Sequence, residues 1–188
     1  MPRSTKRTGR RKRDHLLPAE FNRLLDAAAT TGSHGLRNRT MVLMAFRHGL
    51  KLGELTDLRW KMVDFRRKLL RLGGSAERAK YPHPLAADEI KALKQLKELY
   101  PPSPNVFVSD YGEKLAERSA SRIIFEAGEA AGFKFQVTSN MLRHGCGYAL
   151  ARAGHNIVAI QHYLGLNDIR RVRRYVELPD QPFKGFWK

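Results

Sequence analysis

The sequence predicts one mainly α-helical domain with a small three-stranded antiparallel sheet. Apolar residues recur at helical spacing along most of the chain, and they alternate only between about residues 62 and 85. With 42% hydrophobic residues among 188, the chain can bury a core, and its length suits a single domain. We therefore expect a flexible basic arm at 1–14, a folded domain at 15–176 and a C-terminal tail at 177–188.

Three helices are expected before the sheet. The first covers about 18–29, where apolar side chains repeat every three or four positions and Pro18 suits the first turn. The second covers 37–47 and closes at Gly49. A short third helix, over about 52–60, has leucines at helical spacing. These three helices can share one core.

The period then changes, and short strands are expected around Gly73-Gly74. Their predicted ranges are 62–65, 68–72 and 81–85. Helical spacing returns afterwards, interrupted by a proline-rich break at 101–104 and a short segment at 106–108. The further helices are expected at 86–99, 116–131, 141–153, 157–164 and 168–176.

The charge of the chain points to a polyanionic partner. Lysine and arginine number 35 against 18 acidic residues, giving a net charge of +17. Phosphates neutralised by such a surface release condensed counterions, so double-stranded nucleic acid is the first partner class and an acidic membrane surface the second. Solubility alone does not need so large an excess of one sign.

Other classes are disfavoured by what the sequence lacks. Cys146 is the single cysteine, so neither an intramolecular disulfide nor a thiolate zinc site is expected, and a reducing compartment follows. The histidines show no metal-ligand spacing, and no glycine-rich phosphate loop is present. No run approaches the roughly 18 apolar residues of a membrane span. We expect a cytoplasmic, nucleoid-associated protein without metal or cofactor.

The first thirteen residues carry a dense run of positive charge without apolar periodicity. Such an arm can follow a DNA backbone or enter a groove, and a merely solvated tail is the alternative. The basic residues of the arm are Arg3, Lys6, Arg7, Arg10, Arg11, Lys12 and Arg13.

The most informative motif lies near the C-terminus. The segment Asn140-Met-Leu-Arg-His144 is followed 22 positions later by Leu166, in Leu164-Gly-Leu166, and nine positions later by Tyr175. This layout resembles the tyrosine recombinases, in which a His-x-x-Arg-His segment, a Leu-Gly-His segment and a nucleophilic tyrosine stand at this spacing. Upstream, the segment 49–60 resembles the first box of that family, and Pro84-Leu85 resembles the end of its β-hairpin.

The resemblance covers roughly residues 16–188, and the length is similar to that of the short fimbrial-switch invertases. It implies attack of Tyr175 on a DNA phosphodiester, a 3′-phosphotyrosyl link and no metal or nucleotide cofactor. Arg143 and Lys51 would hold the phosphate, and His144 would support the site. The reaction needs cationic donors because charge accumulates on the phosphate in the transition state.

Four arginines precede the tyrosine in the sequence. We expect their positive field to favour the phenolate, and we expect them to contact DNA. They are Arg170, Arg171, Arg173 and Arg174.

Several positions depart from the family pattern. Lys51 replaces an arginine and loses the planar fork that holds two phosphate oxygens. Asn140 replaces a histidine and cannot exchange a proton, while Leu166 replaces another histidine and donates no hydrogen bond. The hairpin lysine is missing from its usual place, so Lys80 becomes the candidate proton donor to the leaving oxygen, with Arg78 beside it as a DNA contact.

Two functions therefore stay open. The first is a site-specific recombinase of integrase or invertase type, with attenuated chemistry, that acts as a dimer or tetramer on DNA. The second is a catalytically silent DNA-binding relative with a regulatory or architectural role. A general basic nucleic-acid binder would not explain why Lys51, Arg143 and Tyr175 occur in family order.

The tail contains Phe183, Phe186 and Trp187, which would either dock on a neighbouring protomer or fold back onto the domain.

Overall fold

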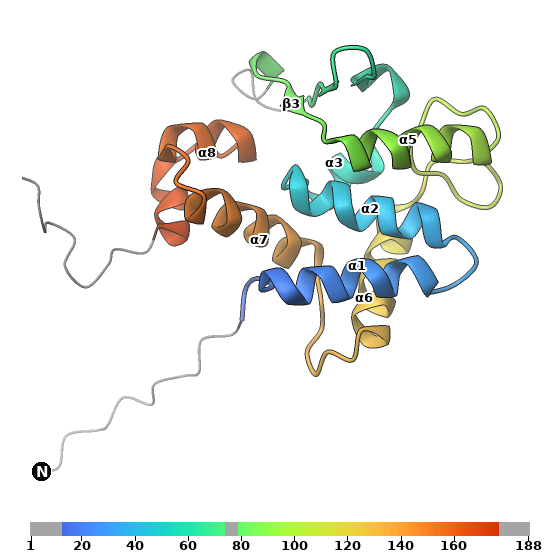
Figure 1. Ribbon diagram of the computed structural model, residues 1–188, viewed down its shortest axis with the longest axis horizontal. Helices are drawn as coiled ribbons and strands as arrows, with labels where there is room; N and C mark the ends of the chain where they lie inside the picture. The colour runs from blue at the N-terminus through green and yellow to red at the C-terminus, as the bar shows by residue number, and fades with distance from the viewer. Residues whose placement is uncertain (1–12, 74–78, 177–188) are drawn as a thin grey trace, which may run out of the picture.

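The computed structural model describes residues 13–73 and 79–176 (Figure 1). Its first part consists of the predicted helices α1 (Pro18–Thr30) and α2 (Gly35–Arg47) and of α3 (Leu52–Thr56), which is shorter than the predicted 52–60. α1 and α2 run antiparallel and pack along their lengths. Residues 1–12 of the predicted arm, residues 177–188 of the predicted tail and residues 74–78 lie outside the described residues.

The three-stranded antiparallel sheet is confirmed, in the order β1-β2-β3. Its strands are β1 (Val63–Asp64), β2 (Leu69–Leu70) and β3 (His83–Pro84), after a 3-10 turn at Trp60–Met62. Val63 pairs with Leu70, which in turn pairs with His83. The strands are shorter than the predicted 62–65, 68–72 and 81–85, and the chain turns between β1 and β2, where Lys68 takes a positive φ of 57°.

The later helices match the predicted ranges to within about two residues. They are α5 (Ala87–Leu99), α6 (Glu117–Ala130), α7 (Ser139–Arg152) and α8 (Ile157–Leu164). The last predicted helix is instead the 3-10 segment η2 (Ile169–Tyr175), which begins where the Asp168 side chain accepts a hydrogen bond from the backbone N–H of Arg170. The predicted 106–108 segment is buried and forms only an isolated bridge, between Val108 and Lys114.

Two separate clusters of buried apolar residues hold the fold together. The larger cluster joins α1, α2, α5 and α6 to the sheet. The smaller cluster holds α7, α8 and η2 together, on the left of Figure 1. It consists of Cys146, Ile160, Leu164, Val172 and Tyr175. α7 also packs on α2, so the smaller cluster is fixed to the main body through one long helix.

A buried polar cluster joins β3 to α5 and α8. His48 Nε2 lies 3.0 Å from Glu89 Oε1, and His48 Nδ1 lies 3.2 Å from His83 Nδ1. The His83 ring stacks on Tyr163 of α8, with 3.8 Å between ring centroids. Burial raises the pKa of Glu89, but the hydrogen bond and charge of His48 outweigh it, and the pKa lies below its usual range. This cluster fixes the hairpin against α8.

No helix within 13–73 and 79–176 has the length and apolar character needed to cross a bilayer.

Candidate functional site

The sequence-predicted site residues meet in one hollow of about 480 Å³ between α3, α7 and η2. Besides the buried Arg143, four of its lining residues are lysine or arginine and carry a positive charge. The lining consists of Lys51, Asn140, Arg143, His144, Gly165, Leu166, Asn167, Arg170, Arg171, Arg174 and Tyr175. Residues separated by more than 120 positions in the sequence thus line one surface.

Tyr175 closes one wall of the hollow and is only 4% exposed. Its hydroxyl lies 2.9 Å from His144 Nδ1. Its ring packs against Gly147 and meets Tyr148 edge-on, with 5.2 Å between centroids and an interplanar angle of 84°. The nucleophile position is therefore held by packing as well as by a hydrogen bond.

The expectation that the arginines favour the phenolate of Tyr175 is wrong in its net effect. Burial raises the pKa of Tyr175 above 10.0, while Arg143 and Arg174 lower it by less. Desolvation dominates because the ring belongs to the smaller apolar cluster, where the charged form would lose water. The other three arginines of η2 are exposed to water and do not counter this burial.

His144 contacts Tyr175 on one side and Arg174 on the other. Arg174 Nη1 lies 3.3 Å from His144 Nε2. Arginine can only donate, so Nε2 accepts, and in the neutral ring the hydrogen is then assigned to Nδ1, which donates to the Tyr175 oxygen. Burial, and then the charge of Arg174, lower the pKa of His144 below 6.5, so the ring is neutral near pH 7. His144 therefore touches the Tyr175 hydroxyl directly.

Arg143 lies at the junction of the two halves of the molecule and is 6% exposed. Its guanidinium donates to the carbonyl oxygens of Gly49, after α2, and Leu164, at the end of α8. Glu54 Oε2 lies 3.9 Å away and balances part of its charge. Arg143 therefore fixes the relative position of the first box and α8 while it lines the hollow.

The three substituted positions all face the same hollow. Lys51 is exposed just before α3, and its backbone N–H donates to Glu54 Oε2 at 2.8 Å. Asn140 is exposed in the first turn of α7. Leu166 is half-buried directly after α8, where its side chain supplies no donor.

Lys80 does not line the hollow. Its ammonium lies 5.6 Å from the ring centroid of Tyr81, and that ring meets His162 edge-on at 5.8 Å. Arg173 is exposed and outside the lining as well. The predicted DNA contacts Arg3, Arg7, Arg10, Arg11 and Arg78 lie outside the described residues.

Arg13, the last residue of the basic run, contacts the folded domain. It forms an ion pair with Glu20 of α1, and its guanidinium lies 4.9 Å from the ring centroid of Phe135. The next residue, Asp14, has one carboxylate oxygen 3.8 Å from Arg174 Nη2. The predicted boundary of the arm therefore falls on residues that already pack against the domain.

Sequence reasoning missed the structural role of Gly147 and the contacts of Asp14 and His15. The close spacing of Gly145 and Gly147 on one helix was the available signal, since glycine permits close packing. A β-carbon at Gly147 would lie 2.6 Å from Tyr175 Cζ. Nothing local marked Asp14, because its partner lies 160 positions away in the sequence.

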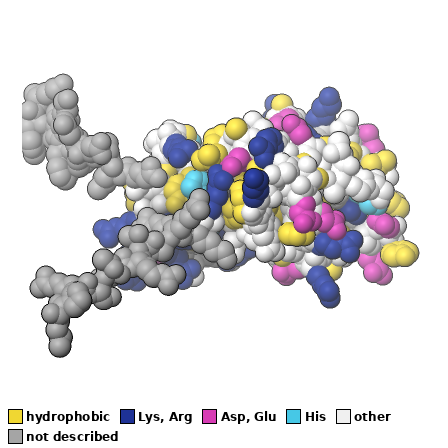
Figure 2. Space-filling model, turned by 90° about the horizontal axis from the view of Figure 1, so that it is seen from below, with side chains coloured by type: hydrophobic (Ala, Val, Ile, Leu, Met, Phe, Trp, Pro, Cys, Tyr) yellow, Lys and Arg dark blue, Asp and Glu magenta, His cyan; other side chains and the backbone are white. Residues whose placement is uncertain are grey.

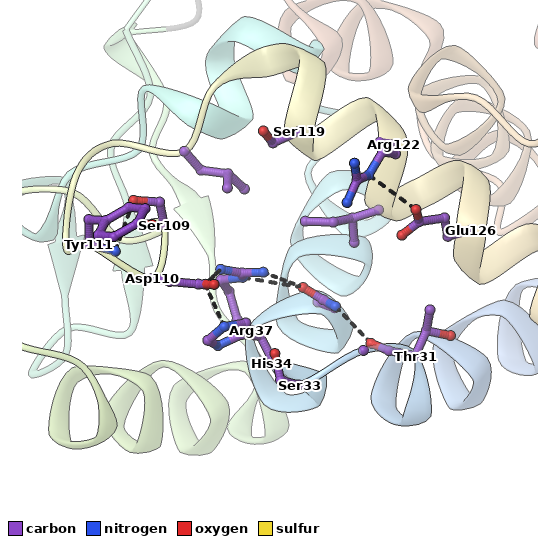
Figure 3. A pocket seen from close by; sticks show the side chains of 14 residues that line it. Thr31, Ser33, His34, Arg37, Ser109, Asp110, Tyr111, Ser119, Arg122 and Glu126 are labelled. Carbon is purple, nitrogen blue, oxygen red and sulfur yellow. Dashed lines mark hydrogen bonds and ion pairs between the residues drawn. The ribbon is translucent and has the colours of Figure 1, made fainter.

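A second hollow, of about 340 Å³, lies between the start of α2 and the 109–111 turn (Figure 3). Its charged side chains pair with one another. Arg37 donates to the Val108 carbonyl at 2.9 Å and lies 3.6 Å from Asp110. His34 Nε2 lies 2.5 Å from the same carboxylate. Because these charges are balanced internally, this hollow is a poorer candidate for a phosphate.

The distribution of charge agrees with this choice. On the face in Figure 2, most of the acidic side chains lie over the right-hand half, away from α7 and α8. Across 13–73 and 79–176, no group of three or more His, Cys, Asp or Glu side chains could hold a metal ion.

Comparison with known proteins supports one family. Residues 14–181 match the phage integrase family. The type 1 fimbriae regulatory protein FimB of Escherichia coli strain K12 is 34% identical over 182 residues, covering 94% of this chain and 90% of that protein. FimE of the same strain is 32% identical over 183 residues, covering 94% and 92%.

Solved structures share the fold. The XerH site-specific recombinase bound to difH substrate superposes with a TM-score of 0.78 at 22% identity, covering 93% of this chain and 55% of that one. The XerA recombinase gives 0.74 at 24% identity, covering 92% and 63%. This chain thus spans less than two thirds of these two recombinases. The matched family over most of the chain, together with the assembled hollow, shows that the protein belongs to the phage integrase family of tyrosine recombinases.

Proposed function

We propose that the protein is a site-specific DNA recombinase of invertase or integrase type, with attenuated strand cleavage, and that Tyr175 is its nucleophile. One observation carries the proposal: the Tyr175 hydroxyl, paired with His144, lies at a hollow whose lining is rich in positive charge. The charged lining residues are Lys51, Arg143, Arg170, Arg171 and Arg174. A DNA phosphate is the anion that such a lining fits. The family match supports a recombinase, and the likeness to two type 1 fimbriae regulatory proteins agrees with the resemblance to the short fimbrial-switch invertases.

The proposed step exchanges one phosphoester for another. The Tyr175 oxygen attacks phosphorus, the bond to the 5′-oxygen breaks, and a 3′-phosphotyrosyl link forms. In the tautomer described above, His144 Nδ1–H donates to the attacking oxygen and stabilises its developing phenolate. The phenolic hydrogen passes to solvent water. Reversal by the 5′-hydroxyl of another strand would complete the exchange without a metal or nucleotide cofactor.

The expected weakening of strand cleavage is based on three substituted residues in the lining of the hollow. Lys51 offers a point charge instead of a fork, Asn140 cannot exchange a proton, and Leu166 offers no donor. Each lost donor of this kind costs about 10²–10³ in rate, although such losses do not add simply. Lys80 is the proposed proton donor to the leaving oxygen. It is exposed and outside the lining, so bound DNA would have to bring that oxygen to it.

A second candidate function is a silent DNA-binding relative. The specific observation in its favour is that the nucleophile position is 4% exposed with a raised pKa of Tyr175, while Leu166 occupies a donor position. Binding depends on many phosphate contacts and cleavage on a few placed donors, so the first can persist without the second.

The proposed partner is duplex DNA, bound by a dimer or tetramer, in the cytoplasm and associated with the nucleoid. XerH is described as bound to its difH substrate, and λ integrase as a dimer bound to a core site, which supports DNA as partner. Gel filtration with and without duplex DNA tests the assembly. A monomer at all concentrations on DNA would contradict it.

The deciding experiment uses a nicked suicide duplex made from the inverted repeats nearest the gene. A denaturant-resistant protein–DNA band is expected with wild type and not with Tyr175→Phe. Tyr111→Phe is the matched control, because Tyr111 is 91% exposed and lines the other hollow. If wild type and both variants shift the duplex but form no band, the silent function replaces the recombinase.

A further inference from the structure

The short segment between the basic run and α1 packs against the helix that carries His144. Leu16 is 3% exposed and belongs to the larger apolar cluster. The His15 ring lies over Tyr148 of α7, with 3.9 Å between centroids. The segment 13–16 is therefore part of the folded domain.

Asp14 begins a chain of contacts that ends at the nucleophile. Its Oδ1 lies 2.9 Å from His15 Nδ1, and its Oδ2 lies 3.8 Å from Arg174 Nη2. The other terminal nitrogen of Arg174 lies 3.3 Å from His144 Nε2. His144 Nδ1 in turn meets the Tyr175 hydroxyl. Three contacts therefore connect Asp14 to the Tyr175 hydroxyl, through Arg174 and His144.

The hydrogen-bonding groups of Arg174 determine which atoms donate and which accept in these contacts. Arg174 can only donate, so its contact with Nε2 leaves Nδ1 as the protonated nitrogen of the neutral ring. The Asp14 carboxylate attracts the guanidinium from its far side, at an ion-pair distance of 3.8 Å, and so favours the orientation of Arg174 that makes this contact. Without it, nothing described in the chain of contacts would keep the half-exposed Arg174 side chain turned toward His144.

We propose that Asp14 and His15 are positioning residues: Asp14 orients Arg174 and thereby sets the tautomer of His144, while His15 braces Tyr148 against the ring of Tyr175. The effect on cleavage rests on the proposed function, whereas the effect on the His144 tautomer does not.

The first test measures His144 itself. In protein labelled with ¹⁵N at histidine, His144 of wild type is expected to show Nδ1 as the protonated nitrogen, and Asp14→Asn to show a larger fraction of the Nε2–H form. The groups facing His144 are Arg143, Arg174, Tyr175, His15 and Asp14. Of these, Asp14 is the carboxylate that raises the pKa of His144, so that pKa is expected to fall further in Asp14→Asn.

The second test measures cleavage of the suicide duplex. Asp14→Asn is expected to lower the rate about two- to five-fold, which is the effect of one half-exposed ion pair. Asp14→Glu is expected to restore it, since 3.8 Å leaves room for a longer side chain. Asp26→Asn, on an exposed position of α1, is the matched control and should change neither measurement.

The outcomes separate the two proposals. If wild type cleaves nothing, the recombinase fails, and the nitrogen spectra still decide the role of Asp14. If Asp14→Asn leaves the His144 tautomer and pKa as in wild type, the positioning role is wrong, whatever the cleavage rate does. A lower melting temperature with an unchanged His144 spectrum would assign Asp14 a structural role only and would also overturn the proposal.

Discussion

The ring of Tyr175 lies directly against the backbone of Gly147, so close that a β-carbon at position 147 would come within 2.6–2.7 Å of three ring carbons. The helix α7 and the 3-10 segment η2 therefore approach each other at a position that has no room for a β-carbon. The place of the nucleophile depends on this contact as much as on its hydrogen bond with His144.

Gly147→Ala is therefore expected to displace Tyr175 and to lower cleavage by about 10²-fold, since misplacement by about 1 Å has effects of this size. Overpacking should also reduce the free energy of unfolding by about 1–3 kcal/mol. Cleavage assays and urea unfolding measure the two effects. Gly73→Ala is the control, because nothing lies within 4 Å of a β-carbon there. Equal cleavage by both variants would show that the contact is unimportant.

Cleavage is expected to rise with pH between about 7 and 9. Burial raises the pKa of Tyr175 above 10.0, so the phenolate fraction is small in this range and grows about tenfold for each unit of pH. His144, whose lowered pKa leaves it neutral throughout, adds no change there. Single-turnover rates on the suicide duplex measure this, with DNA binding recorded at each pH. A level profile would mean that the phenolic proton is not lost before attack.

Lys51→Arg is expected to increase cleavage by about tenfold or more, because the guanidinium fork can hold two phosphate oxygens at once. Duplex affinity should stay within about twofold, since the charge is unchanged. Lys61→Arg, which makes the same change on the exposed 3-10 turn, is the control. A rate that does not respond to Lys51→Arg would place the phosphate away from residue 51.

Arg171→Gln is expected to weaken DNA binding evenly across sequences. Loss of one phosphate contact should reduce the slope of log affinity against log salt by about 0.9. Arg171 is exposed and lines the hollow that contains Tyr175. Arg122→Gln is the control, because Arg122 is also exposed but lines the second hollow. Titrations at four or more salt concentrations measure the slopes. Identical slopes for the two variants would remove Arg171 from the DNA interface.

Glu89→Gln is expected to reduce the free energy of unfolding by about 1–3 kcal/mol at neutral pH, because a buried charged acceptor is lost. The pKa of Glu89 is held below its reference of 4.5, so its contribution is present above that pH and disappears as the pH falls through the lower folded value. Urea unfolding at about pH 7 and about pH 3.5 should therefore show the difference between the proteins shrinking in acid. If the difference in free energy of unfolding between wild type and Glu89→Gln is the same at both pH values, the effect comes from packing and not from the charge of Glu89.

Periodicity predicted the helices well because their apolar faces repeat every three or four residues over 13 or 14 positions, as in α1, α2 and α7. It was weaker for strands of two residues, whose extent depends on partners elsewhere in the chain. Over Ile169–Tyr175 the apolar residues Ile169, Val172 and Tyr175 are spaced by three, which fits a short α-helix as well as the 3-10 helix that forms, so periodicity did not distinguish the two.

The motif spacing also predicted which side chains line the hollow, Lys51, Arg143, His144 and Tyr175 among them. It could not predict the ionisation of Tyr175, because the four neighbouring arginines are visible in the sequence, whereas the burial that outweighs them is not. The same holds for Lys80, whose ammonium turns to Tyr81 instead of the hollow. Sequence distance says little about such contacts.

Tyr175 is one of only five residues assigned to the smaller apolar cluster. A tyrosine that swings out to reach a phosphorus atom takes its ring away from Cys146 and Val172 and leaves a void behind. If attack by Tyr175 requires this movement, its rate depends on a local opening of α7, α8 and η2, separate from the stability of the rest of the fold. Amide hydrogen exchange in these three elements would then report how often the protein is competent to react, and substitutions that tighten the cluster would slow the reaction while raising the melting temperature.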